Sequence, residues 1–314
     1  MKYIIEAKNI VKKFEDKTAL KGIDIRIPEK SIFGLLGPNG AGKTTFIRII
    51  NQISYPDEGE ILFDGGPLLP ETVEQIGYLP EERGLYRKME VGEQALYLAG
   101  LKGLPKQEAL QCLKHWFTKF EIENWWNKKV EELSKGMQQK IQFITTVVHQ
   151  PKLLILDEPF SGFDPVNTQL IKKEILELRA QGATVIFSTH NMKSVEEICD
   201  EIALINHGEV ILNGTVEEVR KKYSTRRYEI VFKNSNWIAF ANALWAGFEL
   251  VEKEEKNGVF RALVSIPENS SVNQLLQAVI PIAEIISVQE KIPSMDEIFI
   301  NVVTQKQTSD VENQ

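Results

Sequence analysis

Cysteine is scarce in this chain, because only Cys112 and Cys199 among its 314 residues carry a thiol. The two lie far apart in unrelated local sequence, so they form neither a metal-binding spacing nor a disulfide framework. The chain also lacks a signal-peptide pattern at its start, since Met1–Glu6 leads directly into a strand-like run. These absences predict a protein of the reducing cytosol.

Long apolar runs are missing as well. A membrane-spanning helix needs about 18 or more apolar residues, and the nearest approach, residues 275–288, is interrupted by Gln277, Pro281 and Glu284. Basic residues are outnumbered, with 37 Lys and Arg against 44 Asp and Glu for a net charge of −7. Nucleic-acid-binding surfaces are normally basic, so no nucleic-acid partner is expected. Any membrane association must then come through a partner protein.

The segment Gly37–Thr44 fits the phosphate-binding loop G-x-x-x-x-G-K-[ST] at every position. A buried strand is predicted before it and a helix after it, which is the context that the motif requires. Glycines let backbone N–H groups approach phosphates, and the helix start adds the positive end of its dipole. We expect Lys43 to reach the β- and γ-phosphates, and Thr44 or Thr45 to hold Mg²⁺. The predicted nucleotide-binding residues here are Gly37, Pro38, Asn39, Gly40, Ala41, Gly42, Lys43, Thr44 and Thr45.

A second apolar strand, Leu153–Leu156, ends in two carboxylates, Asp157 and Glu158. An aspartate at the exit of a buried strand is suited to hold Mg²⁺, usually through its water shell. Glu158, in the following turn, is placed to polarise a water for attack on the γ-phosphate. Together with Lys43, the pair predicts hydrolysis of a nucleoside triphosphate.

Three further residues carry both a structural and a functional interpretation. Ser134 precedes a predicted helix, where it is a candidate N-cap. His190 follows a predicted strand over residues 185–189 and is, taken alone, as compatible with packing as with catalysis. Phe14 is placed before the first pair of strands, where its ring is either core or a face for stacking on a base.

The order of these segments along residues 3–222 resembles the ATP-binding subunits of ABC transporters. The matching segments are the phosphate loop, Leu133–Gln138, the strand ending in Asp157, Ser161–Asp164 and His190. The resemblance implies an ATPase that binds ATP and Mg²⁺ and works as a head-to-tail dimer with a second copy of itself.

In such a dimer, each ATP lies between the phosphate loop of one copy and Ser134 and Gly136 of the other. The resemblance further implies that His190 contacts the γ-phosphate and orients Glu158, and that Phe14 stacks on adenine. These are roles that the isolated motifs do not establish.

Two places depart from the family pattern. Lys135 and Met137 replace the third and fifth residues of the usual Leu-Ser-Gly-Gly-Gln segment, and Glu81 stands where the family commonly has glutamine. A carboxylate is a hard oxygen ligand, so Glu81 is a candidate Mg²⁺ ligand. Its negative charge beside a triphosphate is unfavourable unless the metal or Arg83 offsets it. We expect hydrolysis to survive these changes with an altered rate or coupling.

The string Glu81–Tyr86 and the ending Ile292–Phe299 resemble ATPases of bacterial exporters, including the sodium-extrusion type, that pair with separately encoded permeases. This resemblance implies a location at the cytoplasmic face of the plasma membrane, peripheral through the permease, and a protein that is soluble when isolated. The transported molecule is not readable, because an ATPase subunit does not contact the cargo.

The predicted fold is α/β: a P-loop ABC-type ATPase core over residues 1–222 with a helical subdomain inserted at about 86–150. Over residues 223–305, strands and helices in the order β-α-β-β-α-β predict a small ferredoxin-like α+β domain. The basic segment 220–227 is interpreted as a solvated linker, with an anionic-lipid contact as the alternative. Residues 306–314 are polar and predicted to be disordered.

Two other functions compete with the transporter ATPase. A soluble translation or DNA-repair ATPase is disfavoured by the single phosphate loop and by the absence of sustained heptads. A nucleotide-sensing module with little turnover is prompted by Glu81 and Lys135, and a measurement of ATPase activity separates it from the transporter subunit.

Overall fold

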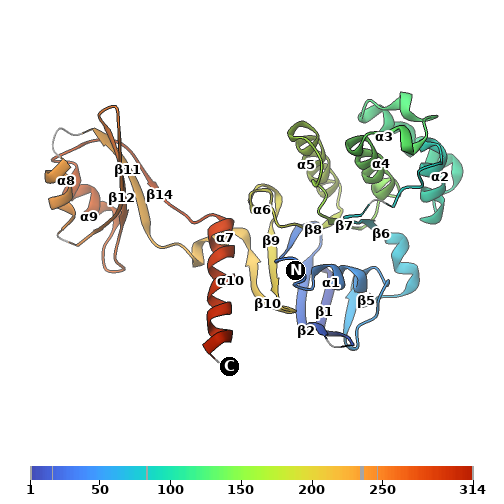
Figure 1. Cartoon of the computed structure of the whole chain (residues 1–314), viewed down its shortest axis with the longest axis horizontal. Helices are drawn as coiled ribbons and strands as arrows, with labels where there is room; N and C mark the ends of the chain where they lie inside the picture. Colours follow the sequence, from blue (N-terminus) through green and yellow to red (C-terminus); the bar gives the residue numbers. More distant parts are fainter. Residues whose placement is uncertain (1, 16, 83, 234–236, 246, 313–314) are drawn as a thin grey trace. The chain divides into compact units, whose positions relative to one another are not determined.

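The chain forms two compact units, residues 1–216 and 217–314. The computed structural model describes residues 2–15, 17–82, 84–233, 237–245 and 247–312 (Figure 1). Each unit has its own hydrophobic core and is described separately.

The first unit contains two sheets. Its antiparallel sheet has the order β2-β1-β4-β5, made of β1 (Tyr3–Phe14), β2 (Lys17–Pro28), β4 (Glu58–Phe63) and β5 (Gly66–Pro67). Its six-stranded sheet has the order β10-β9-β3-β8-β7-β6, made of β3 (Ile32–Leu36), β6 (Ile76–Leu79), β7 (Leu153–Asp157), β8 (Thr184–Ser188), β9 (Glu201–Asn206) and β10 (Glu209–Thr215). All but β10 run parallel, and β3, β7 and β8 are buried along their whole length. Near-continuous apolar strands are typical of such a sheet.

Helix α1 (Lys43–Ile50) joins the two sheets into one core. Its apolar residues Phe46, Ile47, Ile49 and Ile50 are buried in the cluster that also includes residues of β1, β2, β3 and β7. Helices α5 (Pro165–Ala180) and α6 (Met192–Ile198) follow β7 and β8. This is the expected α/β nucleotide-binding core.

The predicted helical insertion is present. It contains α2 (Val91–Leu101), α3 (Lys106–Lys119) and α4 (Lys135–Val147), which gather at one side of the unit (Figure 1). Three short 3-10 helices complete the first unit: Pro70–Gln75, Glu123–Trp125 and Val130–Glu132.

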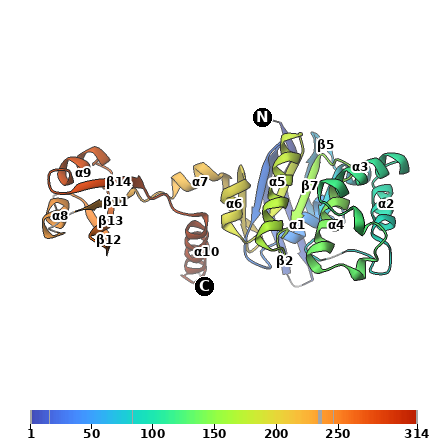
Figure 2. The same cartoon turned by 90° about the horizontal axis from the view of Figure 1, so that it is seen from above.

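The second unit contains the predicted ferredoxin-like arrangement. Its elements are β11 (Arg227–Lys233), α8 (Trp237–Leu244), β12 (Glu249–Lys256), β13 (Val259–Ser265), α9 (Val272–Val279) and β14 (Glu284–Glu290). The antiparallel sheet has the order β12-β13-β11-β14, and α8 and α9 lie together on one of its faces (Figure 2). Phe232, Phe240 and Leu275 lie at the centre of the core between helices and sheet. The order of strands and helices along this segment is what predicted this domain.

Three expectations about boundaries differ from the structure. The division between units falls after Val216 rather than after Lys222, and the basic residues up to Lys222 belong to helix α7 (Val216–Lys222) instead of a linker. The helix is favoured because its first turn is acidic and its last turn is basic, as the helix dipole requires. Lys221 Nζ also lies 2.6 Å from Glu217 Oε1, one turn earlier.

The second difference concerns the end of the chain. Helix α10 (Met295–Glu312) continues through most of the segment predicted to be disordered, while residues 313–314 lie outside the described residues. A helix that has formed its first turn extends at little further cost, and this segment contains good helix formers such as Lys306 and Gln307.

The third difference concerns Phe14, which was expected before the first strand pair. It is the last residue of β1 and lies opposite Lys17, the first residue of β2, inside that pair. Residues Lys12–Phe14 belong to β1 because their backbone pairs with β2 as far as the turn between the two strands.

Candidate active site

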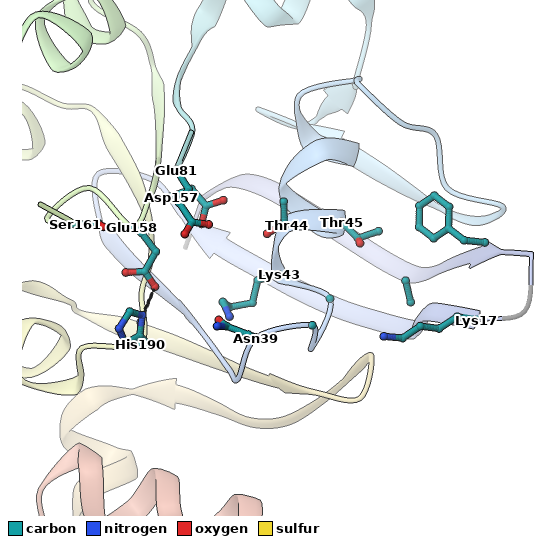
Figure 3. Close-up of a pocket in the computed structure, with 14 residues that line it drawn as sticks. Lys17, Asn39, Lys43, Thr44, Thr45, Glu81, Asp157, Glu158, Ser161 and His190 are labelled. Carbon is teal, nitrogen blue, oxygen red and sulfur yellow. Dashed lines mark hydrogen bonds and ion pairs between the residues drawn. The ribbon is translucent and has the colours of Figure 1, made fainter. Parts of the chain in front are cut away.

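A pocket of about 450 Å³ lies where the phosphate loop and α1 meet the carboxyl ends of the parallel strands (Figure 3). Ligands of open α/β sheets bind at this edge, because the loops that leave the strands converge there. Most of the predicted site residues line it. The lining residues are Phe14, Lys17, Ala19, Asn39, Gly40, Gly42, Lys43, Thr44, Thr45, Glu81, Asp157, Glu158, Ser161 and His190.

The phosphate loop follows β3 and requires glycine at Gly37 and Gly42. Their φ angles are +147° and +118°, and a Cβ on Gly37 would lie 2.1 Å from the carbonyl oxygen of Ile205. Such positive φ angles and close approaches exclude other residues. Gly37 and Pro38 do not line the pocket but accept hydrogen bonds from Lys43 Nζ, at 2.7 and 3.1 Å. Ala41, within the loop, is buried.

Lys43 is held inside the loop with 8% of its surface exposed. Burial lowers the pKa of its ammonium, and the charges of Glu158, Asp157 and Glu81 oppose that shift. The Lys43 ammonium and the backbone N–H groups of a glycine-rich loop at a helix start are suited to bind a multiply charged anion.

The donor atoms expected to hold Mg²⁺ meet in this pocket. Asp157, at the end of β7, is 5% exposed, and burial, followed by the charges of Glu81 and Glu158, raises the pKa of its carboxyl group. Thr44 and Glu81 line the same pocket (Figure 3). A divalent cation would offset the buried negative charge, and these hard oxygen donors fit Mg²⁺. Among the described residues, no group of three or more His, Cys, Asp or Glu is arranged to hold a metal ion.

Glu158 is fixed by three hydrogen bonds. Its Oε1 lies 2.7 Å from His190 Nδ1 (Figure 3) and accepts a hydrogen bond from the His190 backbone N–H at 3.0 Å. Its Oε2 accepts a hydrogen bond from Thr189 Oγ1 at 3.2 Å. The backbone of Glu158 has φ +48°, which is uncommon for a residue with a side chain. Strained residues of this kind cluster at functional sites. The two predicted catalytic side chains thus come together at the ends of β7 and β8.

Ser134 and Gly136 are not among the residues that line this pocket. Ser134 is the N-cap of α4, and its Oγ accepts a hydrogen bond from Met137 N at 3.3 Å. No heavy atom lies within 4 Å of a Cβ placed on Gly136. Within one chain, these two residues therefore leave the start of α4 open.

Lys17, Ala19 and Ser161 also line the pocket and were not predicted from the sequence. Lys17 was not predicted because Phe14 was expected outside the strand pair. In the structure β1 and β2 form a hairpin in which Phe14 and Lys17 lie opposite each other. Ser161 belongs to a segment that was recognised but not assigned to the pocket. Arg83, named as a charge partner of Glu81, lies outside the described residues.

Comparisons with known proteins agree with this geometry. The family model described as ABC transporter matches residues 20–161, and one described as ATP-binding protein DrrA1-3-like, C-terminal domain, matches residues 214–303. The chain is 48% identical over 222 residues to the Bacillus subtilis protein called uncharacterized ABC transporter ATP-binding protein YhaQ, covering 71% of this chain and 74% of that protein. It is 30% identical over 230 residues to the lipopolysaccharide export system ATP-binding protein LptB of Haemophilus influenzae, covering 71% and 95%.

A solved structure described as the ATP binding subunit of an ABC transporter superposes with a TM-score of 0.66 at 30% identity, over 70% of this chain and 93% of that one. In the described part of the chain, no helix has the length and apolar character to cross a membrane. The fold, the nucleotide pocket and these relatives lead to one conclusion. The chain belongs to the ABC transporter ATP-binding proteins and is a nucleotide-binding ATPase subunit of such a transporter.

Proposed function

We propose that this subunit serves a bacterial exporter, hydrolyses ATP as a head-to-tail dimer around two Mg²⁺-ATP, and drives a separately encoded permease. The observation that carries the proposal is the Glu158–His190 pair beside Lys43 in one pocket. A carboxylate that is already oriented, next to a cation for phosphates, is the arrangement needed for attack of water on a γ-phosphate.

Each residue has a defined task in this reaction. The phosphate loop and Lys43 bind and orient the triphosphate, and Glu158 accepts a proton from the attacking water. His190 holds the Glu158 carboxylate in place through its backbone N–H and ring nitrogen. Thr44, Asp157 and Glu81 would hold Mg²⁺, which would neutralise charge that develops on the phosphate oxygens. Phe14 would stack on adenine.

The dimer is proposed because the start of α4 is an open anion-binding surface that does not line the nucleotide pocket of the same chain. Ser134 Oγ, the N–H of Gly136 and the positive end of the helix dipole would close the site around a phosphate of the second copy. Lys135 adds an exposed ammonium at the same helix start. ATP binding would then shift the population from separate copies to the closed dimer.

Export and membrane attachment are part of the proposal, and the relatives and the sequence support them. The Haemophilus relative is named for lipopolysaccharide export, and the finer resemblance to sodium-extrusion ATPases stays a prediction. We place the subunit at the cytoplasmic face of the plasma membrane, bound through its permease by the helical block and the loop Glu81–Arg87.

Glu158→Gln tests the mechanism. The amide keeps the size of the side chain but cannot accept a proton from water, so ATP should still bind while hydrolysis falls at least about 100-fold, and dimers should accumulate in size-exclusion chromatography with ATP. Glu121→Gln is a matched control, because Glu121 is another glutamate with a positive φ, +56°, and does not line the pocket. Normal hydrolysis by Glu158→Gln would refute the mechanism. Absence of turnover in the unaltered subunit with its permease would instead favour the nucleotide-sensing module.

A further inference from the structure

The ring of Phe14 has a charged neighbour, Lys12, which does not itself line the nucleotide pocket. Lys12 Nζ lies 5.5 Å from the centroid of the ring, within the range of a cation–π interaction. Phe14 itself lines the pocket and is 51% exposed. The Lys12 side chain, in contrast, is only 14% exposed, which is unusual for a lysine that has no structural task.

Asp57, in the connection between α1 and β4, fastens this end of β1. Its Oδ1 lies 2.9 Å from Lys12 Nζ, and its Oδ2 accepts a hydrogen bond from the backbone N–H of Lys13 at 2.6 Å. The backbone N–H of Asp57 donates in turn to the carbonyl oxygen of Val11 at 2.8 Å. One carboxylate therefore fixes both the strand backbone and the ammonium beside the ring.

Two other ion pairs of β1 provide a comparison for the distance and burial of the Lys12–Asp57 pair. Lys8–Glu60 and Lys13–Glu58 have N–O distances of 3.6 and 3.7 Å, and their lysine side chains are 48% and 61% exposed. Exposed pairs of this kind contribute little to stability. The Lys12–Asp57 pair is shorter, better covered, and the one of the three whose lysine contacts an aromatic residue of the pocket.

We propose that Lys12 and Asp57 are positioning residues that hold the Phe14 ring ready to stack on the base of the nucleotide. An exposed ring at a strand end otherwise samples several rotamers, and the bound nucleotide would have to select one. The ammonium interacts with one face of the ring and leaves the other face for the base. The inference rests on the proposed stacking role of Phe14 and adds the two residues that make it effective.

A comparison of two ligands isolates this effect. ATP has a base to stack, whereas inorganic tripolyphosphate occupies only the phosphate loop. In the full chain, Lys12→Met keeps the aliphatic stem but removes the ammonium beside the ring, and Asp57→Asn keeps the shape but removes the carboxylate charge that fixes that ammonium. Both should weaken ATP binding about threefold to tenfold, the size of a lost aromatic or cation–π contact, and should leave tripolyphosphate binding unchanged. The KM for ATP should rise while kcat stays constant.

Lys8→Met is the matched control, and it should change neither affinity. In the double variant Phe14→Ala/Lys12→Met, ATP affinity should equal that of Phe14→Ala, because Lys12 acts through the ring. The inference is overturned if Lys12→Met matches Lys8→Met, if both ligands are weakened equally, or if the two changes add independently. If Phe14→Ala itself leaves ATP binding unchanged, the stacking role fails, and that result is distinct from a failure of Lys12 alone.

Discussion

Lys119 links the helical block to the core, and its removal gives the most specific stability prediction. It is the last residue of α3, and its Nζ lies 2.5 Å from Glu174 and 2.6 Å from Glu177, both on α5. The Glu174 side chain is 2% exposed and that of Glu177 is 38% exposed. Burial lowers the pKa of Lys119, but the hydrogen bonds and charges of Glu174 and Glu177 outweigh burial and raise the pKa overall, so the ammonium stays charged.

Lys119→Met keeps the stem but leaves the Glu174 carboxylate buried without its partner. Breaking a buried ion pair from one side costs about 3 kcal/mol or more, whereas the exposed half of the network, to Glu177, adds at most about 1 kcal/mol. For a unit of 216 residues, 1 kcal/mol corresponds to about 2–4 °C. We therefore expect the first unit to melt about 6–12 °C lower.

Differential scanning calorimetry measures this shift. The transition of the first unit is identified as the one that ATP moves to higher temperature, since the nucleotide pocket lies in that unit. Lys173→Met is the matched control: it also removes a lysine near Glu177, 3.8 Å away, but that pair is exposed, so the expected shift is under about 2 °C. The double variant Lys119→Met/Glu174→Leu should recover most of the loss. Equal small shifts for Lys119→Met and Lys173→Met would refute the reasoning.

Two further predictions concern the helical block and the metal site. Gly92→Ala should destabilise the helical block by about 1–3 kcal/mol in urea unfolding, because the new Cβ would lie 2.2 Å from Trp126 Cε2. Gly100→Ala is the control in the same helix: its Cβ would meet no neighbouring atom within 4 Å, so it should be neutral or stabilising. If both alanines behave alike, the packing of Trp126 on α2 is wrong. Asp157→Asn should raise the melting temperature of the nucleotide-free protein at neutral pH while turnover falls at least about 100-fold. Burial raises the pKa of Asp157 above 3.8, so the ionised carboxylate lowers the stability of the folded protein at every pH above the folded pKa. The increase in melting temperature on Asp157→Asn should therefore narrow as the pH falls. A lower melting temperature for Asp157→Asn would contradict this.

Local sequence patterns predicted a large part of the fold. The apolar strand predicted at Leu153–Leu156 is present as β7 (Leu153–Asp157), and the strand predicted over residues 185–189 is present one residue earlier, at Thr184–Ser188, because both have a continuous apolar pattern. The boundary near Val216 and the continuation of α10 into residues 306–312 were not predicted. Charged and polar residues have no apolar period, so their structure depends on helix dipole, ion pairs and continuation of a neighbouring helix.

The sequence by itself determined the chemistry of the site. The glycines and Lys43 of the phosphate loop, and the carboxylates that end β7, have a spacing that only a narrow range of functions requires, and consecutive residues need no tertiary information to be recognised. It also determined the family, through the order of the motifs.

Only the tertiary structure decided which distant residues act together. The hydrogen bonds between His190 and Glu158, the position of Lys17 opposite Phe14, and the pairing of Lys12 with Asp57 join segments through sheet register and loop packing. Register depends on the pairing of whole strands, and a bulge such as the one between Lys12 and Lys13 changes it without a clear local signal. For that reason the sequence identified the groups expected to bind the phosphates, and the fold identified the residues proposed to hold the ring that is expected to bind the base.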